Sequence, residues 1–338
     1  MKKRIQFIVN PRSGVTKKHR IVDLIEQEID TNYFDYEIVY TQYAGHATLL
    51  AAEASKDGFD IVAAVGGDGS VNEVARGLIG TETILGMIPA GSGNGFAMHL
   101  GWGRNIRSVI RRLAYAEVER VDTCSVNGHT FVNLAGVGYE AAVAQQLRTV
   151  KKRGLQAYMR LSFSGMSKYK FKTYKITVDD KELVTKALSI TVANAPMYGY
   201  NFVVAPLAKY NDGLLEVIVF KKLPWIRYFI SMRRFFDNTM HRSSVVHRLS
   251  GSKVEIEISE PEFAQYDGEG FLVENNKLVF DINPLSLNVL MPKKEPKTDV
   301  FDLLFPKKEV VPIKTEISSL AAAKTLKQVD NDFKIKLL

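Results

Sequence analysis

Three loops of the chain contain glycine, and each lies between a short apolar run and a segment with helical spacing. They are Asn10-Pro11-Arg12-Ser13-Gly14, Gly66-Gly67-Asp68-Gly69-Ser70 and Pro89-Ala90-Gly91-Ser92-Gly93-Asn94-Gly95. A turn from a strand into a helix presents backbone N–H groups and the positive end of the helix dipole, and glycine allows a phosphate to approach closely. Three such turns at one edge of a sheet predict a binding site for the phosphates of a nucleotide.

The second loop also carries an acid, because Asp68 stands between glycines. A carboxylate beside phosphates repels them unless it holds a cation or takes part in proton transfer. Asp68 is therefore predicted to hold magnesium or to orient an attacking hydroxyl. The alternative is a helix N-cap, which Ser70 would serve equally well. The chain has no Gly-x-x-x-x-Gly-Lys-Ser/Thr loop, and its first turn is not Gly-x-Gly-x-x-Gly, so neither common phosphate signature is present.

The elements that must position these loops alternate between strand and helix over the first 125 residues or so. Apolar runs predict strands at 5–9, 36–41, 60–65 and 84–88, and helical spacing predicts helices at 17–29, 46–56, 70–79 and 105–116. This alternation predicts a parallel sheet that is covered on both faces. The ligand of such a sheet lies beyond the carboxyl ends of its strands.

The second half of the chain is predicted to be mainly antiparallel. After a strand at 130–134 and a helix at 138–167 broken at Gly154, alternation or β-branched residues predict strands at 171–179, 183–194, 214–221, 253–259, 271–274, 277–282 and 286–291. An aromatic and basic helix is expected over 224–236. We expect its aromatic stripe, which comprises Trp225, Phe229, Phe235 and Phe236, to belong to the core rather than to an interfacial helix. From Pro292 onward a tail is expected.

The composition is that of a globular protein with a basic surface. The formal net charge of +8 is concentrated in 1–20, 148–186 and 221–248, which favours a polyanionic partner. No zinc spacing, helix-turn-helix or RNA-binding aromatic signature is present, so nucleic acid is not expected. No apolar run approaches the roughly 18 residues that span a bilayer, and the N-terminal apolar run is interpreted as a strand. Cys124 is the only cysteine, which excludes an intrachain disulfide and fits a cytoplasmic protein.

The loops in this order resemble the catalytic domain of diacylglycerol kinases and sphingosine kinases. The resemblance rests on Asn10-Pro11-x-Ser13-Gly14, on Gly66-Gly67-Asp68-Gly69-Ser70-x-Asn72-Glu73 and on Gly91-Ser92-Gly93-Asn94, and it covers about residues 3–292. It implies an α/β nucleotide-binding domain with a parallel sheet, like that of NAD kinases and diacylglycerol kinases, plus a mainly antiparallel β-sandwich-like second domain. The implied ATP-binding domain comprises 1–125 with 286–300, the lipid-substrate domain comprises 126–285, and 301–338 is a C-terminal tail.

The same resemblance implies roles for individual residues. Glu269 of Asp267-Gly268-Glu269 is the implied general base, with Asp68 as the second choice, and Asp212 is an implied magnesium ligand together with the carbonyls of Lys209 and Leu214. From the residues alone, Asp267-Gly268-Glu269 and the Asn211-Asp212-Gly213 segment are both turns. Glu140, which follows Gly136-Val137-Gly138, has two interpretations: a residue that orients the substrate, and a surface acid at a helix start, which is favoured. The implied nucleotide-binding residues are Asn10, Pro11, Arg12, Ser13, Gly14, Thr41, Gly66, Gly67, Asp68, Gly69, Ser70, Asn72, Glu73, Gly91, Ser92, Gly93 and Asn94.

The implied activity is an ATP- and Mg²⁺-dependent transfer of phosphate to a lipid hydroxyl. The acceptor is diacylglycerol, a sphingoid base or a related lipid, and Gly91-Ser92-Gly93-Asn94 is nearer the sphingosine kinase form without deciding between them. The expected partners are a lipid substrate and an anionic membrane surface, which the protein contacts peripherally from the cytoplasm. Whether it also forms a homodimer is left undecided. Two alternatives remain: an NAD kinase-like small-molecule kinase, and a nucleotide-responsive membrane-binding protein without catalysis.

Overall fold

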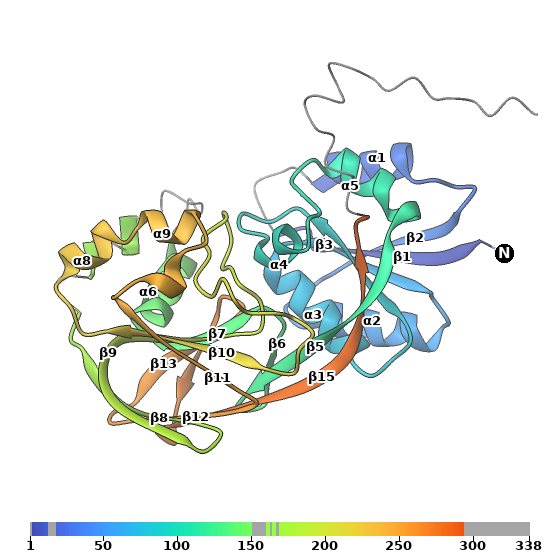
Figure 1. Ribbon diagram of the computed structural model, residues 1–338. Coiled ribbons are helices and arrows are strands. Elements are labelled where there is room, and N and C mark those ends of the chain that lie inside the picture. The colour runs from blue at the N-terminus through green and yellow to red at the C-terminus, as the bar shows by residue number, and fades with distance from the viewer. Residues whose placement is uncertain (1, 13–17, 151–159, 163, 167–168, 294–338) are drawn as a thin grey trace, which may run out of the picture. The chain divides into compact units, whose positions relative to one another are not determined.

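The computed structural model describes residues 2–12, 18–150, 160–162, 164–166 and 169–293 (Figure 1). Residues Met1–Lys293 form one compact unit. Some sequence predictions lie outside the described residues. These are Ser13 and Gly14 of the first loop, the helix break at Gly154 and the tail at 301–338.

The first part of the chain forms a parallel sheet in the order β4-β3-β1-β2. Its strands are β1 (Lys3–Val9), β2 (Phe34–Tyr40), β3 (Ile61–Gly66) and β4 (Ile84–Pro89). β3 is buried along its whole length, because both faces of the sheet are covered. Its sequence is therefore a continuous apolar run. The predicted parallel sheet is confirmed, with strand ends that differ by one or two residues.

Helices connect these strands and cover the sheet (Figure 1). They are α1 (Lys18–Glu28), α2 (His46–Lys56), α3 (Asp68–Leu78), α4 (Gly95–His99) and α5 (Ile106–Arg112), which continues into a 3-10 turn at Leu113–Tyr115. α3 begins two residues earlier than predicted, so that Asp68 is its first residue. α2 and α3 lie close together because Gly77 has no side chain: a Cβ there would come within 2.5 Å of the carbonyl oxygen of Thr48.

Two long strands join the parallel part of the sheet to the antiparallel part. β5 (Glu117–Val126), which the sequence analysis did not predict, pairs antiparallel with β15 (Lys277–Met291), and the end of β15 pairs parallel with β4. The predicted strands at 277–282 and 286–291 are thus one strand. Its register shifts between Asn283 and Leu287, where Leu285 has a φ of 50°. The sheet is therefore continuous through both halves of the described chain.

The second half is mainly antiparallel, as predicted. Its further strands are β6 (His129–Phe131), β7 (Leu134–Gly138), β8 (Lys172–Val178), β9 (Lys181–Ala193), β10 (Leu215–Lys221), β11 (Val246–Gly251), β12 (Lys253–Ile258), β13 (Glu262–Tyr266) and β14 (Glu269–Val273). β11 and β13 were not predicted, and the predicted strand at 130–134 is divided between β6 and β7. β9 pairs with β7, β8 and β10. The sheet encloses a second core, separate from that of the parallel part.

Helices of the second half lie on one side of β9, β10 and β11 (Figure 1). They are α6 (Tyr139–Thr149), α8 (Trp225–Ile230), α9 (Arg233–Phe236) and a 3-10 turn at Met240–Arg242. The helix predicted over 224–236 is thus two short helices. The expectation that its aromatic stripe belongs to the core is wrong for three of four residues. Trp225, Phe229 and Phe236 are 54%, 57% and 47% exposed, and only Phe235 is buried. Within the described ranges, no helix is long and apolar enough to cross a membrane.

Candidate active site

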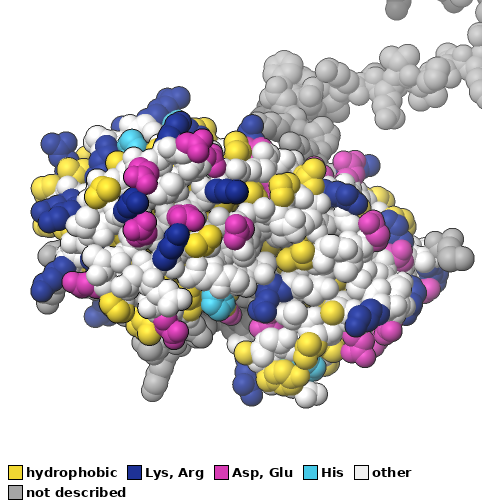
Figure 2. Space-filling model, turned by 90° about the horizontal axis from the view of Figure 1, so that it is seen from below, with side chains coloured by type: hydrophobic (Ala, Val, Ile, Leu, Met, Phe, Trp, Pro, Cys, Tyr) yellow, Lys and Arg dark blue, Asp and Glu magenta, His cyan; other side chains and the backbone are white. Residues whose placement is uncertain are grey.

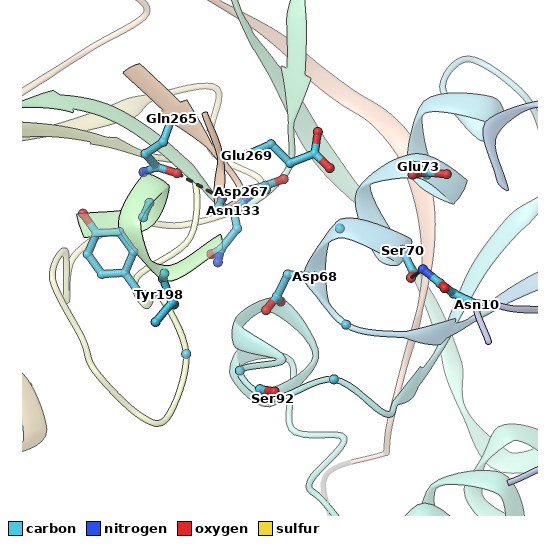
Figure 3. Close-up of a pocket in the computed structure, with 18 of the residues that line it drawn as sticks. Asn10, Asp68, Ser70, Glu73, Ser92, Asn133, Tyr198, Gln265, Asp267 and Glu269 are labelled. Atoms are coloured by element: carbon cyan, nitrogen blue, oxygen red, sulfur yellow. Dashed lines mark hydrogen bonds between the residues drawn. The ribbon is translucent and has the colours of Figure 1, made fainter. Parts of the chain in front are cut away.

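A cavity of about 750 Å³ lies between the glycine loops and the turn that joins β13 to β14 (Figure 3). The loops follow β1, β3 and β4, whose carboxyl ends meet at one edge of the parallel sheet, as predicted. The cavity brings together most of the predicted site residues that the structure describes. Those that line it are Asn10, Pro11, Arg12, Thr41, Gly67, Asp68, Gly69, Ser70, Glu73, Gly91, Ser92, Gly93 and Glu269.

The second and third loops touch each other through glycine. A Cβ on Gly91 would lie 2.3 Å from the Cα of Gly67, so a side chain at this position is sterically excluded. Asn94 closes the third loop behind the cavity wall: its side-chain oxygen accepts from the backbone N–H of Gly91 and its amide donates to the Gly91 carbonyl, both at 2.9 Å. Gly66 ends β3, and its carbonyl accepts from Ala90 at 2.8 Å. Asn94 and Gly66 thus shape the loops rather than line the cavity.

Asp68 joins the start of α3 to the start of α4. Its Oδ1 accepts from the backbone N–H of Phe96 at 3.3 Å, and its Oδ2 lies on the side of Gly93. Burial raises the pKa of the Asp68 carboxyl, and hydrogen bonds from the backbone of Gly95, Phe96 and Asn94 oppose this shift. The N-cap residue of α3 is Gly67, so Asp68 does not cap its own helix. Its carboxylate instead faces the cavity beside two glycine loops, and its role in holding magnesium or orienting a hydroxyl stays a prediction.

The first loop and the second strand complete the wall on the side of the parallel sheet. Asn10 donates from its side-chain amide to Oγ of Ser70 at 3.2 Å, which joins the first loop to α3. Thr41 follows β2, and its backbone N–H donates to Val9 at 3.0 Å. The carboxylate of Glu73 accepts from the backbone N–H of Ala47 at 3.2 Å, so part of its hydrogen-bonding capacity serves the start of α2.

Asp267 is the buried acid that connects the two halves of the cavity. Its Oδ1 accepts from the backbone N–H groups of Asn133 and Leu134 at 3.0 and 3.1 Å, and its Oδ2 accepts from the N–H of Val132 at 2.9 Å. Oδ2 also accepts from the amide of Asn72 at 2.9 Å. Burial, the largest cause, raises the pKa of Asp267 to about 6. Asn72, a predicted nucleotide contact, is buried and does not line the cavity.

Glu269 faces the second glycine loop from the other side of the cavity (Figure 3). Its Oε2 accepts from the hydroxyl of Tyr266 at 3.1 Å, and a Cβ on Gly69 would lie 3.7 Å from its Oε1. The tight turn at Asp267 and Gly268, both with positive φ, projects Glu269 toward α3. The Asp-Gly-Glu segment is therefore a turn, as the residues alone indicate, and it also brings a carboxylate to the cavity.

Glu140 is a cavity residue, so the expectation that it is a surface acid is wrong. Its Oε2 accepts from the hydroxyl of Thr191 at 2.5 Å and from the hydroxyl of Tyr198, and Gln265 donates to its Oε1 at 3.4 Å. Burial raises the pKa of Glu140 to about 8. A Cβ on Gly136 would overlap this carboxylate. The Gly-Val-Gly before the helix was the only sequence signal, because the partners of Glu140 lie far along the chain.

A second, apolar cavity of about 80 Å³ adjoins the first and shares Glu140, Tyr198 and Phe202 with it. Most of its wall is made of aliphatic and aromatic side chains. Among them are Val143, Met166, Leu188, Phe220, Tyr228 and Phe235. The carboxyl group of Glu140 thus stands where a polar cavity meets an apolar one.

The predicted magnesium turn lies outside both cavities. Asp212 is exposed, and its Oδ1 accepts from the backbone N–H of Leu214 at 3.1 Å. The buried acid Asp122, which the sequence analysis did not single out, accepts from the backbone of Gly213 and of Leu285, both at 2.8 Å. An exposed carboxylate is the kind of oxygen ligand that Mg²⁺ prefers, and the ligand set of Asp212, Lys209 and Leu214 stays a prediction. No cluster of three or more His, Cys, Asp or Glu is found among the described residues.

Two family models match this chain. The model of the diacylglycerol kinase catalytic domain matches residues 4–126, and the model of the YegS C-terminal NAD kinase beta sandwich-like domain matches residues 133–291. Between them they include the three glycine loops and the turn that carries Glu269.

Named relatives agree with these models. A probable lipid kinase YegS-like protein of Chromohalobacter salexigens is 32% identical over 250 residues, which cover 70% of this chain and 78% of that protein. A diacylglycerol kinase of Bacillus subtilis is 28% identical over 278 residues, which cover 79% of this chain and 90% of that protein.

The fold is also that of a solved structure. The crystal structure of a putative diacylglycerol kinase from Bacillus anthracis superposes with a TM-score of 0.70 at 23% identity, covering 86% of this chain and 98% of that one. The likeness confirms the fold class predicted from the sequence, an α/β part with a parallel sheet followed by a β-sandwich-like part. The chain belongs to the family of diacylglycerol kinases and YegS-like lipid kinases.

Proposed function

We propose that this chain is an ATP- and Mg²⁺-dependent kinase that phosphorylates the hydroxyl of diacylglycerol, a sphingoid base or a related lipid. The observation that carries the proposal is the cavity in which Glu269, from β14, faces three glycine loops, the second of which carries Asp68. Phosphoryl transfer requires groups that hold phosphates and a base that accepts the proton of the attacking hydroxyl. The diacylglycerol kinases among the relatives make diacylglycerol the first lipid to test.

In this proposal the loops hold the phosphates of ATP through backbone N–H groups and the N-terminal end of α3. The lipid hydroxyl oxygen forms a bond to the γ-phosphorus, the bond from that phosphorus to the β–γ bridging oxygen breaks, and ADP leaves. The hydroxyl proton goes to Glu269, with Asp68 as the second candidate. Mg²⁺, when bound, neutralises charge on the phosphate oxygens, and Asp68 is the carboxylate of the loops that would hold it.

The lipid side of the proposal is supported by the second cavity. Its wall is apolar, and its volume of about 80 Å³ has room for a short part of a hydrocarbon chain, next to the first cavity and its carboxylates. Because the pKa of Glu140 is raised to about 8, this carboxyl is mostly protonated at neutral pH. It is then a neutral group that can donate to one oxygen of the lipid headgroup.

Several finer predictions accompany this function. We propose that residues 1–125 with 286–300 bind ATP and that 126–285 bind the lipid. Of the three clusters of buried side chains, one comes mainly from the first of these parts and two come mainly from the second, which supports this division. A structural Mg²⁺ at Asp212, Lys209 and Leu214 also stays a prediction, as do a cytoplasmic location and a homodimer.

The test is transfer of labelled phosphate to defined acceptors. Purified protein is incubated with γ-labelled ATP, Mg²⁺ and mixed micelles that contain diacylglycerol or sphingosine, with NAD in a parallel reaction. Labelled phosphatidic acid or sphingosine phosphate is the expected product, and it identifies the lipid class. Label on NAD would contradict the proposal. Tight ATP binding without transfer to any acceptor would favour the non-catalytic alternative.

A further inference from the structure

Helices α8 and α9 present apolar side chains on two opposite sides. On the inner side, Tyr228 and Phe235 are buried, and the ring of Phe235 stacks on Phe202 with centroids 3.9 Å apart. The outer side also carries large apolar side chains, all of them exposed to solvent. These side chains, the outer face, are Trp225, Ile226, Phe229, Ile230 and Phe236. Phe236 is 47% exposed, because its ring also meets that of Phe202 edge-on with centroids 5.8 Å apart.

The outer face is too apolar to be an ordinary protein surface. Four of its five members follow the spacing i, i+1, i+4, i+5 from Trp225 and therefore lie along one side of α8. A helix that is apolar on all sides is normally buried, and a contiguous exposed apolar patch marks an interaction site. Ile230, at the end of α8, is 71% exposed. The patch therefore calls for a partner that covers it.

The charges around the outer face favour an anionic partner. Between residues 221 and 242 the sequence has six Lys or Arg and one acid, Asp237. Asp237 lies 3.9 Å from Arg233, whose side chain is 91% exposed, so this pair leaves the arginine accessible. Arg227 is also exposed, in the middle of α8. Tryptophan and long basic side chains around an apolar patch are typical of segments that lie in a membrane interface.

Another face of the molecule carries charges of both signs. Figure 2 shows basic and acidic side chains intermingled over the surface that is seen from below in that view. A surface of mixed sign has little net attraction for an anionic bilayer. The combination of an apolar patch with an excess of one sign of charge distinguishes the outer face of α8 and α9 from the face in Figure 2.

We infer that α8 and α9 dock on an anionic lipid bilayer through their outer face. The inference rests on the proposed function in one respect: docking brings the site to its substrate only if that substrate is a lipid. The inner-side residues Tyr228, Met232 and Phe235 line the apolar second cavity, which meets the active-site cavity at Glu140. A bilayer on the outer face therefore lies one helix away from the apolar second cavity.

Intrinsic tryptophan fluorescence can report this contact. It has two tryptophans: Trp102 is fully buried and donates to the carbonyl of Leu290 at 3.1 Å, and Trp225 is on the outer face. With vesicles of phosphatidylcholine and phosphatidylglycerol, the tryptophan emission is expected to shift to the blue and to be quenched by lipids brominated in their acyl chains. Trp225→Phe should abolish both signals while the protein still sediments with the vesicles.

Substitution of the outer face tests the inference without relying on fluorescence. Ile230→Glu should weaken vesicle sedimentation by about tenfold or more, since it replaces an inserted apolar side chain by a charge. Arg233→Gln should weaken it by about fivefold, because each basic residue near an anionic surface contributes roughly that factor. Leu49→Glu, at an exposed leucine of α2, is the matched control and should bind like the parent chain. Thermal melting of each variant confirms that it folds.

The binding assay contains no ATP, so binding is read independently of catalysis. A chain that binds vesicles through the outer face but phosphorylates no lipid would keep this inference and contradict the proposed function. Equal sedimentation of Ile230→Glu and the parent chain would overturn the inference, as would a parent chain that does not sediment with these vesicles. It would also be overturned if Trp225 is shielded in a dimer that Ile230→Glu dissociates, because the partner would then be a second copy.

Discussion

The side-chain amide of Asn72 donates a hydrogen bond of 2.9 Å to the carboxylate of Asp267, a residue 195 positions further along the chain. Asn72 lies on the helix that begins at the second glycine loop, and Asp267 begins the turn that projects Glu269. The same Asn72 amide also donates to the carbonyl of Thr130 at 2.8 Å. One buried side chain thus connects the loops proposed to hold ATP with the proposed general base.

Removing this link should lower catalysis more than ATP binding. In Asn72→Ala, one hydrogen bond to a buried carboxylate and one to a carbonyl are lost, which should cost about 1–3 kcal/mol of unfolding free energy. Because Glu269 is then held less firmly opposite Gly69, kcat should fall while the Kd for ATP changes little. Chemical denaturation and steady-state kinetics measure the two effects. Asn32→Ala, at an exposed position, should change neither. Loss of ATP affinity without loss of kcat would contradict the positioning role.

The contact between the second and third loops should not tolerate a side chain. Gly91→Ala places a Cβ 2.3 Å from the Cα of Gly67, so the loops must separate. The expected result is a loss of ATP affinity of at least about tenfold, with an overpacking cost of roughly 1–3 kcal/mol. Isothermal titration calorimetry with ATP and Mg²⁺ measures the affinity.

Gly270→Ala is a matched control for this substitution, because its Cβ would meet nothing closer than 3.5 Å. It should bind ATP like the parent chain. If Gly91→Ala also binds ATP normally, the loops do not form the nucleotide site.

The raised pKa of Glu140 predicts how stability depends on pH. The folded-state pKa is about 8 against an ordinary value of 4.5, so the folded chain holds a proton that the unfolded chain releases. This group's contribution to stability is therefore fully present below 4.5, declines as pH rises, and is lost above about 8. Melting temperatures of the parent chain and of Glu140→Gln, compared across this range, isolate the contribution. A difference in melting temperature between the two proteins that does not change with pH would contradict a raised pKa of Glu140.

Magnesium should stabilise the protein without ATP if the Asp212 turn holds an ion. We expect addition of Mg²⁺ to raise the melting temperature of the parent chain and a chelator to reverse the increase. Asp212→Ala should abolish the response, whereas Asp180→Ala, at another exposed turn, should preserve it. A full response in Asp212→Ala would place the ion elsewhere.

Local pattern was sufficient to predict the parallel part of the fold. Strands such as β3 are buried on both faces and read as short apolar runs, and the glycine loops after them mark where the helices begin. The antiparallel strand β13 was missed because its sequence contains Glu262 and Gln265, both buried. Glu262 accepts from the hydroxyls of Tyr169 and Tyr174 at 2.7 and 3.0 Å. These partners come from distant parts of the chain, so no window of sequence reveals them.

In the candidate site, too, residues that depend on their sequence neighbours were predicted and residues that depend on distant partners were not. The residues of the glycine loops were predicted because their chemistry depends on neighbours in sequence. The hydrogen-bond partners of Asp267 come from residues 132–134 and those of Glu140 include Thr191 of β9, and these segments come together with the two acids only in the folded chain. The aromatic stripe of α8 and α9 was assigned to the core because helical spacing does not show whether a second layer covers the helix.

The most direct test of the account is a single-turnover measurement of phosphate transfer from ATP to diacylglycerol by the parent chain and by Glu269→Gln. The neutral amide keeps the shape of the side chain but cannot accept a proton. The account predicts that both proteins bind ATP equally and that the rate of transfer falls by about 10²–10⁴ in the variant. Transfer by Glu269→Gln at the parental rate would contradict the assignment of Glu269, and absence of transfer by the parent chain to any lipid would contradict the proposed function.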